Sequence, residues 1–160
     1  ANTKTYGLRI EGDINVVLND LKMVDCGGVN IQLGAKVVVN DAFIKVKYAN
    51  ASRHLFYIAY EGSELTINSG EFEITGTSQK YLVADGNATV GFGKINVYGG
   101  KFHGVLASGA QPVTDKGNNV KIYGGEYYVY PTRAFDPTPY LADGYTTVAL
   151  ADSWVKVVAE

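Results

Sequence analysis

The chain has 160 residues, and its 14 basic and 16 acidic side chains give a formal net charge of −2. These charges are scattered along the sequence without blocks, so we expect no binding to nucleic acid. No apolar run approaches the roughly 20 residues that span a bilayer, so we expect no insertion into a membrane. The 19 glycines and 4 prolines, with abundant valine, isoleucine, tyrosine and threonine, favour strands and tight turns over helices.

One short motif occurs five times along the chain. Its copies are residues 16–23, 37–44, 65–72, 95–102 and 120–127. Each copy alternates apolar and polar residues as a half-buried strand does, turns at an Asn-Asp, Ser-Gly or Gly-Gly pair, and then resumes as another strand. Repeats of roughly 20 to 30 residues built from short strands predict a solenoid whose strands stack about 4.8 Å apart.

A second family of strands alternates with this motif. Its predicted members are residues 8–12, 29–34, 55–62, 81–86 and 105–109. One coil is then a strand, a short corner, a second strand, a turn and a third strand. The longer insertions should gather at one corner of the coil, where solenoids often carry binding loops, and they are residues 47–53, 76–80 and 111–119.

These repeats predict an all-β fold, a single-stranded right-handed parallel β-helix of about five coils. The coils take up residues 1–130, and a C-terminal capping segment takes up residues 131–160, within one domain. Prolines and aromatics replace the motif in the capping segment. Because an open solenoid end exposes core and strand edges, we expect Phe135 and Trp154 to lie over the last coil.

Aligning the five copies predicts two ladders of inward side chains that form the core. One ladder contains Leu18, Val39, Ile67, Val97 and Ile122, and the other contains Met23, Ile44, Phe72, Phe102 and Tyr127. Both consist of apolar or aromatic residues at the same place in every copy, as stacked coils require.

The same alignment predicts an outer column at the turn. Asn19, Asn40 and Asn68 occupy it in the first three copies, and Tyr98 and Tyr123 occupy it in the last two. Asparagine amides can pass hydrogen bonds from coil to coil, and the two tyrosine rings can stack face to face.

The end of the chain carries a resemblance. Residues 124–127 (Gly-Gly-Glu-Tyr), Asp136-Pro137, residues 140–145 and Trp154-Val155 resemble the C-terminal end of right-handed, pectate-lyase-like β-helix repeat regions in bacterial surface proteins and phage structural proteins. The resemblance is close over roughly the last forty residues and rests elsewhere on the repeat pattern. It implies a virion or a bacterial cell surface as the location, and a homotrimer as a candidate oligomer.

Many β-helix proteins cleave polysaccharides, so we tested the carboxylates for such a role. Glu71 and Glu126 lie two coils apart in the alignment, about 9.6 Å by strand spacing, near the upper limit of ~6.5 to 9.5 Å for an inverting pair. Lys101 lies between them and would hold both ionised, which leaves no general acid. We therefore predict a column of surface ion pairs and no catalytic residue.

Other polar groups give no stronger signal. Asp20 aligns with Asp41 and the pair could offer oxygen ligands to calcium, but Asp and Asn residues at turns need no metal, and we favour the metal-free turn. Residues 85–87 (Asp-Gly-Asn) have the composition of an ordinary turn. His54 and His103 have no serine or cysteine recognisably paired with them. We predict no metal and no cofactor.

The chain has 12 tyrosines, more than the core needs. Exposed aromatics on a flat β face suit sugar stacking or a protein interface, although tyrosines on strands also stack simply along the surface. The candidate binding residues are Tyr57, Tyr60, Tyr98, Tyr123 and Tyr128.

The expected function is that of a non-catalytic structural or attachment module, outside the cell on a bacterial surface or on a phage virion as a fibre or decoration protein. Its expected partners are proteins of that assembly, with surface glycans as a further candidate. The alternative is a carbohydrate-binding or polysaccharide-degrading β-helix protein.

Overall fold

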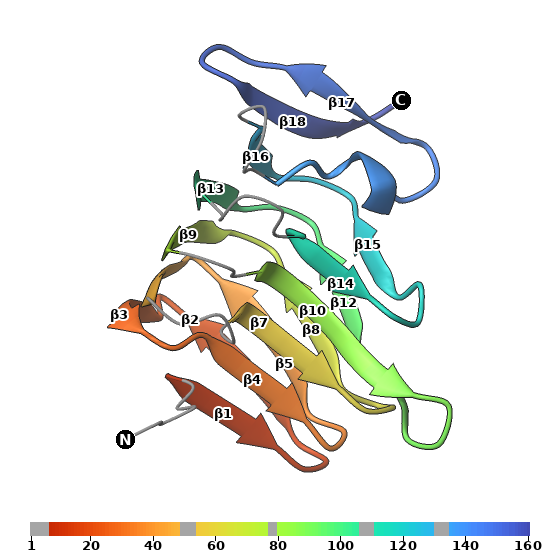
Figure 1. The fold of residues 1–160 in the computed structure, drawn as a ribbon. Helices are drawn as coiled ribbons and strands as arrows, with labels where there is room; N and C mark the ends of the chain where they lie inside the picture. The colour runs from red at the N-terminus through yellow and green to blue at the C-terminus, as the bar shows by residue number, and fades with distance from the viewer. Residues whose placement is uncertain (1–6, 49–53, 77–79, 106–110, 130–134) are drawn as a thin grey trace.

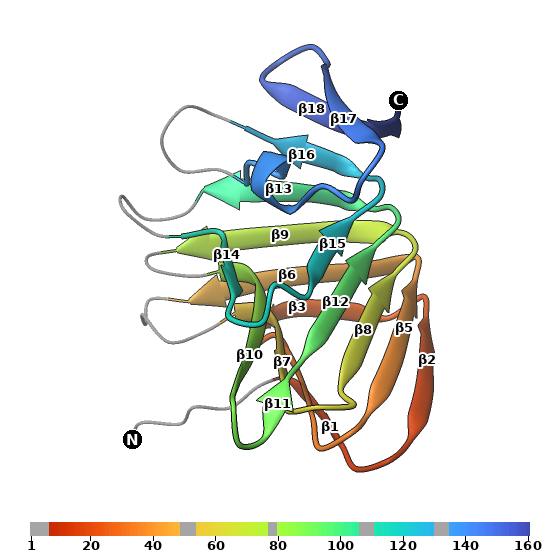
Figure 2. The same ribbon diagram turned by 90° about the vertical axis from the view of Figure 1, so that its right-hand side faces the viewer.

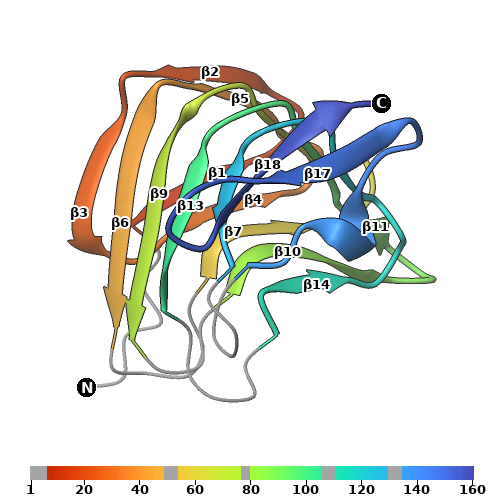
Figure 3. The same cartoon turned by 90° about the horizontal axis from the view of Figure 1, so that it is seen from above.

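A computed structural model describes residues 7–48, 54–76, 80–105, 111–129 and 135–160 of the chain. Their stacked parallel strands form a β-solenoid, which confirms the predicted fold class (Figure 1). Seen along the stack from the C-terminal end, the chain winds counter-clockwise as it approaches the viewer, so the solenoid is right-handed (Figure 3).

Each layer of the solenoid contributes one strand to each of three sheets, two of which are seen stacked in Figure 2. Sheet A contains β1 (Leu8–Glu11), β4 (Val29–Gln32), β7 (His54–Ala59), β10 (Lys80–Asn87) and β14 (Val113–Asp115), with the short β11 (Gly91–Phe92) antiparallel to the end of β10. Sheet B contains β2 (Asn15–Asn19), β5 (Lys36–Asn40), β8 (Glu64–Ile67), β12 (Lys94–Val97) and β15 (Val120–Ile122). Sheet C contains β3 (Lys22–Cys26), β6 (Ala42–Tyr48), β9 (Gly70–Gly76), β13 (Lys101–Val105) and β16 (Glu126–Tyr128). The antiparallel strands β18 (Trp154–Ala159) and β17 (Tyr145–Ala149) continue sheet C, and a 3-10 turn, η1 (Thr138–Tyr140), precedes them.

The solenoid has about three turns, and the prediction of about five coils is wrong. In the described part of the chain, the layers that begin with β4, β7 and β10 are the ones with parallel neighbours on both sides in all three sheets. The layers that begin with β1 and β14 close the two ends of the stack. Counting motif copies overstates the number of turns because it gives these end layers the same weight as the enclosed ones.

The fifth strand of sheet A differs from its predicted position. We expected it at residues 105–109, but Val105 belongs to β13, where it pairs with Thr75 of β9. Residues 106–109 fall outside the described residues. The strand that extends sheet A is β14, whose Val113 pairs with Leu82, inside the segment that we expected to be an insertion.

The two predicted core ladders are confirmed in both register and burial. The first pairs Leu18 with Val39, then continues through Ile67, Val97 and Ile122. The second pairs Met23 with Ile44, then continues through Phe72, Phe102 and Tyr127. All members are fully buried except Leu18 and Met23, which are partly buried because they lie in the first layer.

The C-terminal segment covers one end of this core through Phe135. The ring of Phe135 is fully buried, with its centroid 5.1 Å from that of Tyr81 and 4.9 Å from that of Tyr127. Trp154 also lies against the last coil, but on its outer face: β18 pairs antiparallel with β16, which sets Trp154 beside Tyr128, with Nζ of Lys101 4.6 Å from the centre of its ring. The predicted boundary between coils and cap, after residue 130, falls outside the described residues and stays a prediction.

The asparagine column forms the expected ladder. Nδ2 of Asn40 donates to Oδ1 of Asn19 at 2.8 Å, and Nδ2 of Asn68 donates to Oδ1 of Asn40 at 2.9 Å. The column continues as Tyr98 and Tyr123, whose rings stack with centroids 4.6 Å apart and planes 10° apart.

Replacing the middle member of the ladder should lower stability. Asn40→Ala removes both amide hydrogen bonds, each worth about 0.5–1.5 kcal/mol, so we expect the free energy of unfolding to fall by about 1–3 kcal/mol in urea titration. Asn15→Ala is the matched control, since Asn15 lies on the same sheet face without a side-chain hydrogen bond and should cost under about 0.5 kcal/mol. Equal losses in the two variants would mean that the ladder adds nothing.

Candidate functional site

The five candidate tyrosines do not form one site. Tyr57 and Tyr60 lie together at the end of β7 on the outer face of sheet A and line the same pocket. Tyr98 and Tyr123 stack at the turn between sheets B and C, and Tyr128 lies on the outer face of sheet C. The structure therefore divides the prediction into three separate surfaces.

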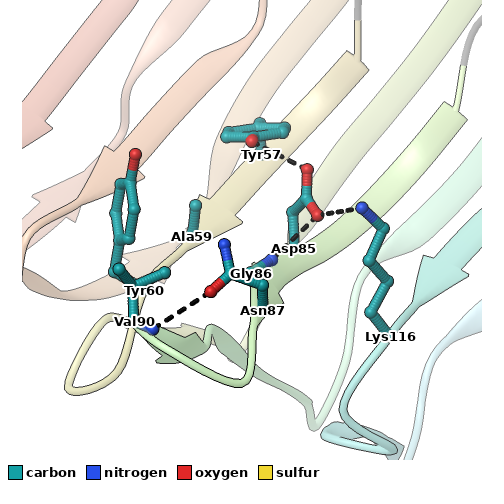
Figure 4. A pocket seen from close by; sticks show the side chains of 8 residues that line it. All are labelled: Tyr57, Ala59, Tyr60, Asp85, Gly86, Asn87, Val90 and Lys116. Carbon is teal, nitrogen blue, oxygen red and sulfur yellow. Dashed lines mark hydrogen bonds and ion pairs between the residues drawn. The ribbon is translucent and has the colours of Figure 1, made fainter.

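The pocket beside Tyr57 and Tyr60 has a volume of about 240 Å³. Figure 4 shows Tyr60 on one side of it and Asp85 with Lys116 on the other, with the short side chain of Ala59 between them. The described residues that line this tyrosine pocket are Tyr57, Ala59, Tyr60, Asp85, Gly86, Asn87, Val90 and Lys116.

Strand alternation aims these side chains outward. Phe56 and Ile58 are fully buried in the core, so Tyr57 and Ala59 point to the opposite face of sheet A. Ala59 pairs in register with Asp85 of the next layer, which brings the carboxylate to the same face. The small side chain of Ala59 leaves the space that the pocket occupies.

Tyr60 holds an unusual backbone conformation. It follows Ala59 at the corner of the coil with φ of 74°, in the left-handed region that bulky residues rarely adopt. The residue at the same corner of the next layer is Gly86, with φ of 148°. The residue at the same corner of the layer below is Leu33, with φ of 56°, so a positive φ belongs to this corner of the coil and does not by itself mark a site.

A small hairpin forms the rim of the pocket. β11 folds back on β10, with Asn87 opposite Gly91. Oδ1 of Asn87 accepts hydrogen bonds from the backbone N–H groups of Thr89 at 2.9 Å and Val90 at 3.2 Å, and the carbonyl of Val90 accepts one from the N–H of Glu61 at 2.8 Å. These bonds tie the hairpin to the corner that carries Tyr60.

Three donors hold the carboxylate of Asp85. The hydroxyl of Tyr57 donates to Oδ2 at 2.9 Å, the N–H of Gly86 donates to Oδ1 at 2.8 Å, and Nζ of Lys116 lies 2.6 Å from Oδ1. Partial burial acts to raise the pKa of Asp85, but the hydrogen bonds from Lys116, Gly86 and Tyr57 outweigh it, and the pKa is lowered. The carboxylate is therefore ionised and fixed in orientation.

Removing the lysine should change that ionisation measurably. In Lys116→Met the pKa of Asp85 should rise, because a hydrogen bond and a favourable charge are both lost. Carbon NMR titration of the Asp85 carboxyl measures it. Since the folded pKa lies below that of the unfolded chain, ionised Asp85 stabilises the fold above about pH 3.9, and this stabilisation is lost as the pH falls through the folded pKa. Lys121→Met, on sheet B, is the control and should leave the titration of Asp85 unchanged. If the titration of Asp85 is also unchanged in Lys116→Met, the contact with Lys116 does not hold the carboxylate.

Tyr98, on which the ring of Tyr123 stacks, lines a second, larger hollow. Its volume is about 380 Å³, and its described lining includes Ser69, Tyr98, Lys101, Glu126 and Lys156 with glycine backbone. Tyr98 is 52% exposed. Nζ of Lys101 lies 4.6 Å from the centre of the Trp154 ring.

The predicted column of ion pairs on sheet C is wrong in its contacts, although its register is right. Lys101 pairs in register with both Glu71 and Glu126, but among the described residues no ion pair joins them. Oε1 of Glu71 instead lies 2.8 Å from Nε2 of His103. Long side chains on a strand can reach diagonal neighbours, and Glu71 contacts its diagonal neighbour His103 instead of Lys101, which lies directly opposite.

Sequence reasoning missed the polar half of the tyrosine pocket. Asp85 was assigned to an ordinary turn, and Lys116 to an insertion. The detectable signal was register: once Ile58 is aligned with Ala84, Asp85 falls beside Ala59 on the outer face. Lys116 follows β14, which only the structure places beside β10.

The remaining polar candidates form no metal centre in the described part of the chain, where no group of three His, Cys, Asp or Glu side chains could hold a metal ion. Asp20 and Asp41 occupy left-handed turn positions, with φ of 52° and 53°.

Burial, with a smaller effect from Lys80, lowers the pKa of His54 to about 4, and the ring of His54 lies 6.0 Å from that of Tyr57.

The comparisons with known proteins returned no match: no family model, no curated protein and no solved structure is significantly similar to this chain. Within the described ranges, no helix is long and apolar enough to span a membrane.

Proposed function

We propose that this protein is a non-catalytic attachment module that acts outside the cell, on a bacterial surface or a phage virion. The observation that carries the proposal is the state of Asp85, the one carboxylate among the described residues of the tyrosine pocket. It is ionised and bound by Lys116, Gly86 and Tyr57. A carboxylate held in this way fixes the pocket's geometry and is a poor general acid.

Two further features support binding over catalysis. Glu71 and Glu126, the closest match to a catalytic pair in the sequence, lie two layers apart on sheet C and outside the tyrosine pocket, and Oε1 of Glu71 lies 2.8 Å from Nε2 of His103. The outer column of Asn19, Asn40 and Asn68 is linked by its own amide hydrogen bonds, and Tyr98 stacks on Tyr123, so these outer side chains already bond or stack with one another. The resemblance of the last forty residues to β-helix regions of bacterial surface and phage structural proteins supports the location.

The experiment combines retention with a test for cleavage. The protein is incubated with intact bacterial cells and with their purified surface polysaccharides, then sedimented. We expect retention on the surface material, with no release of reducing or unsaturated sugar ends. Release of such ends would overturn the non-catalytic assignment, and lack of retention on any surface material would overturn the attachment role.

A homotrimer belongs to the virion-fibre form of the proposal. Light scattering of the purified chain measures it, and we expect a mass three times that of the 17.2 kDa chain. A monomer would remove the fibre form and leave attachment as a single module.

A further inference from the structure

We propose that the tyrosine pocket binds one uncharged sugar residue of a surface glycan. This inference rests on the proposed attachment function and names its ligand. The pocket joins what such a ligand needs: two tyrosine side chains at its walls, fixed polar groups at one side, and no excess charge.

The aromatic part comes from two rings on different supports. Tyr57 is fixed by its strand and by the hydrogen bond to Asp85, and Tyr60 is held by the corner that the hairpin braces through Glu61 and Val90. The C–H faces of a pyranose ring pack against tyrosine rings, and the phenol edges remain polar.

The polar part offers both donors and acceptors. Asp85 has two oxygens with about four acceptor positions, of which three are used in the structure. Lys116 has three N–H donors, of which one faces Asp85. Neighbouring hydroxyl groups of a sugar can therefore donate to the carboxylate and accept from the ammonium group.

The charges that line the pocket favour uncharged sugars over acidic ones. The −1 of Asp85 and the +1 of Lys116 cancel in direct contact, and the other lining residues are uncharged. A uronate would bring a second carboxylate toward Asp85, which costs free energy. An uncharged ring meets no such repulsion.

Size limits the ligand to a single ring. The volume of about 240 Å³ is below the roughly 300–1,000 Å³ of pockets that hold drug-sized ligands. Ala59 keeps the pocket open, whereas the residue paired with it in the layer below is Gln32. Ala59→Gln would therefore place a side chain that this column already accommodates into the space of the ligand.

The experiment is a binding titration with defined probes, followed by amide NMR shifts. The probes are methyl glycosides of glucose, galactose, mannose and N-acetylglucosamine, with methyl glucuronide and methyl galacturonide as acidic counterparts. We expect at least one neutral glycoside to shift the amides of residues 57–60, 85–90 and 116, and to bind at least about tenfold more tightly than either uronide. Failure of all four neutral probes, or tighter binding of the uronides, would overturn the proposal.

Variants separate the ligand site from the fold. Tyr60→Gly removes the ring and relieves the positive φ, so binding should weaken by about tenfold or more while the melting temperature stays equal or rises. Tyr60→Phe keeps the ring and should bind as the wild type does. Ala59→Gln should abolish binding, and Tyr98→Ala, at the other hollow, should leave it unchanged. Undiminished binding by Tyr60→Gly would place the ligand elsewhere.

The same variants distinguish this inference from the proposed function. If cells retain the wild type and Tyr60→Gly equally, attachment stands and the pocket is not its site. If cells do not retain the wild type, the attachment role itself fails, whatever the glycosides do.

Discussion

Phe135→Ala is expected to lower the free energy of unfolding by about 3–5 kcal/mol, the range for truncating a fully buried aromatic side chain. Phe135 is 0% exposed and lies at the C-terminal end of the core, in ring contact with Tyr81, Phe102 and Tyr127. Alanine leaves a cavity over the last layer and uncovers aromatic surface that water would then reach. Urea unfolding followed by tyrosine fluorescence and by circular dichroism measures the loss.

Two controls show whether the loss comes from the cap. Phe135→Met keeps most of the volume and should cost less than about 1.5 kcal/mol. Trp154→Ala removes a larger but partly exposed ring beside Tyr128, and it should cost less than Phe135→Ala. If the two alanine variants are equally unstable, burial of Phe135 over the core is not what closes the solenoid.

The core could be predicted from the sequence because it depends only on period and register. Strand alternation decides which side chains face inward, and each copy of the motif repeats that decision. Ile44, Phe72 and Phe102 therefore align in the structure as they do in the sequence. The asparagine ladder follows for the same reason, since its members touch their direct neighbours.

Contacts that depend on long side chains could not be predicted in this way. Lys101 lies between Glu71 and Glu126 in register, yet its ammonium group contacts Trp154. The partner arrives from β18, far away in the sequence, and the choice between a salt bridge and an aromatic face depends on rotamers. Register alone fixes neither.

The candidate site shows the same division. Tyr57 was predicted as a candidate binding residue, and it does point outward, because Phe56 and Ile58 on either side of it are buried in the core. Lys116 could not be assigned, because the strand before it, β14, departs from the repeat, and the expected strand at residues 105–109 took its place in the alignment. The pocket lies between a layer that follows the repeat and a layer that departs from it. The sequence therefore predicts only the residues of the regular layer.

Gly104→Ala is expected to cost about 2–5 kcal/mol in the free energy of unfolding. Gly104 has φ of +117°, and a Cβ there would lie 2.0 Å from the carbonyl oxygen of Ile74 and 2.8 Å from its nitrogen. The left-handed backbone adds about 1–2 kcal/mol, and the steric overlap adds about 1–3 kcal/mol, because the atoms in the way are backbone of the paired strand β9 and cannot move aside.

Gly12→Ala is the matched control: φ there is +92° and nothing lies within 4 Å of the added Cβ, so only the backbone cost of about 1–2 kcal/mol should appear. Urea unfolding of the two variants separates strain from overlap, and equal losses would show that β13 and β9 can move apart to admit the methyl group.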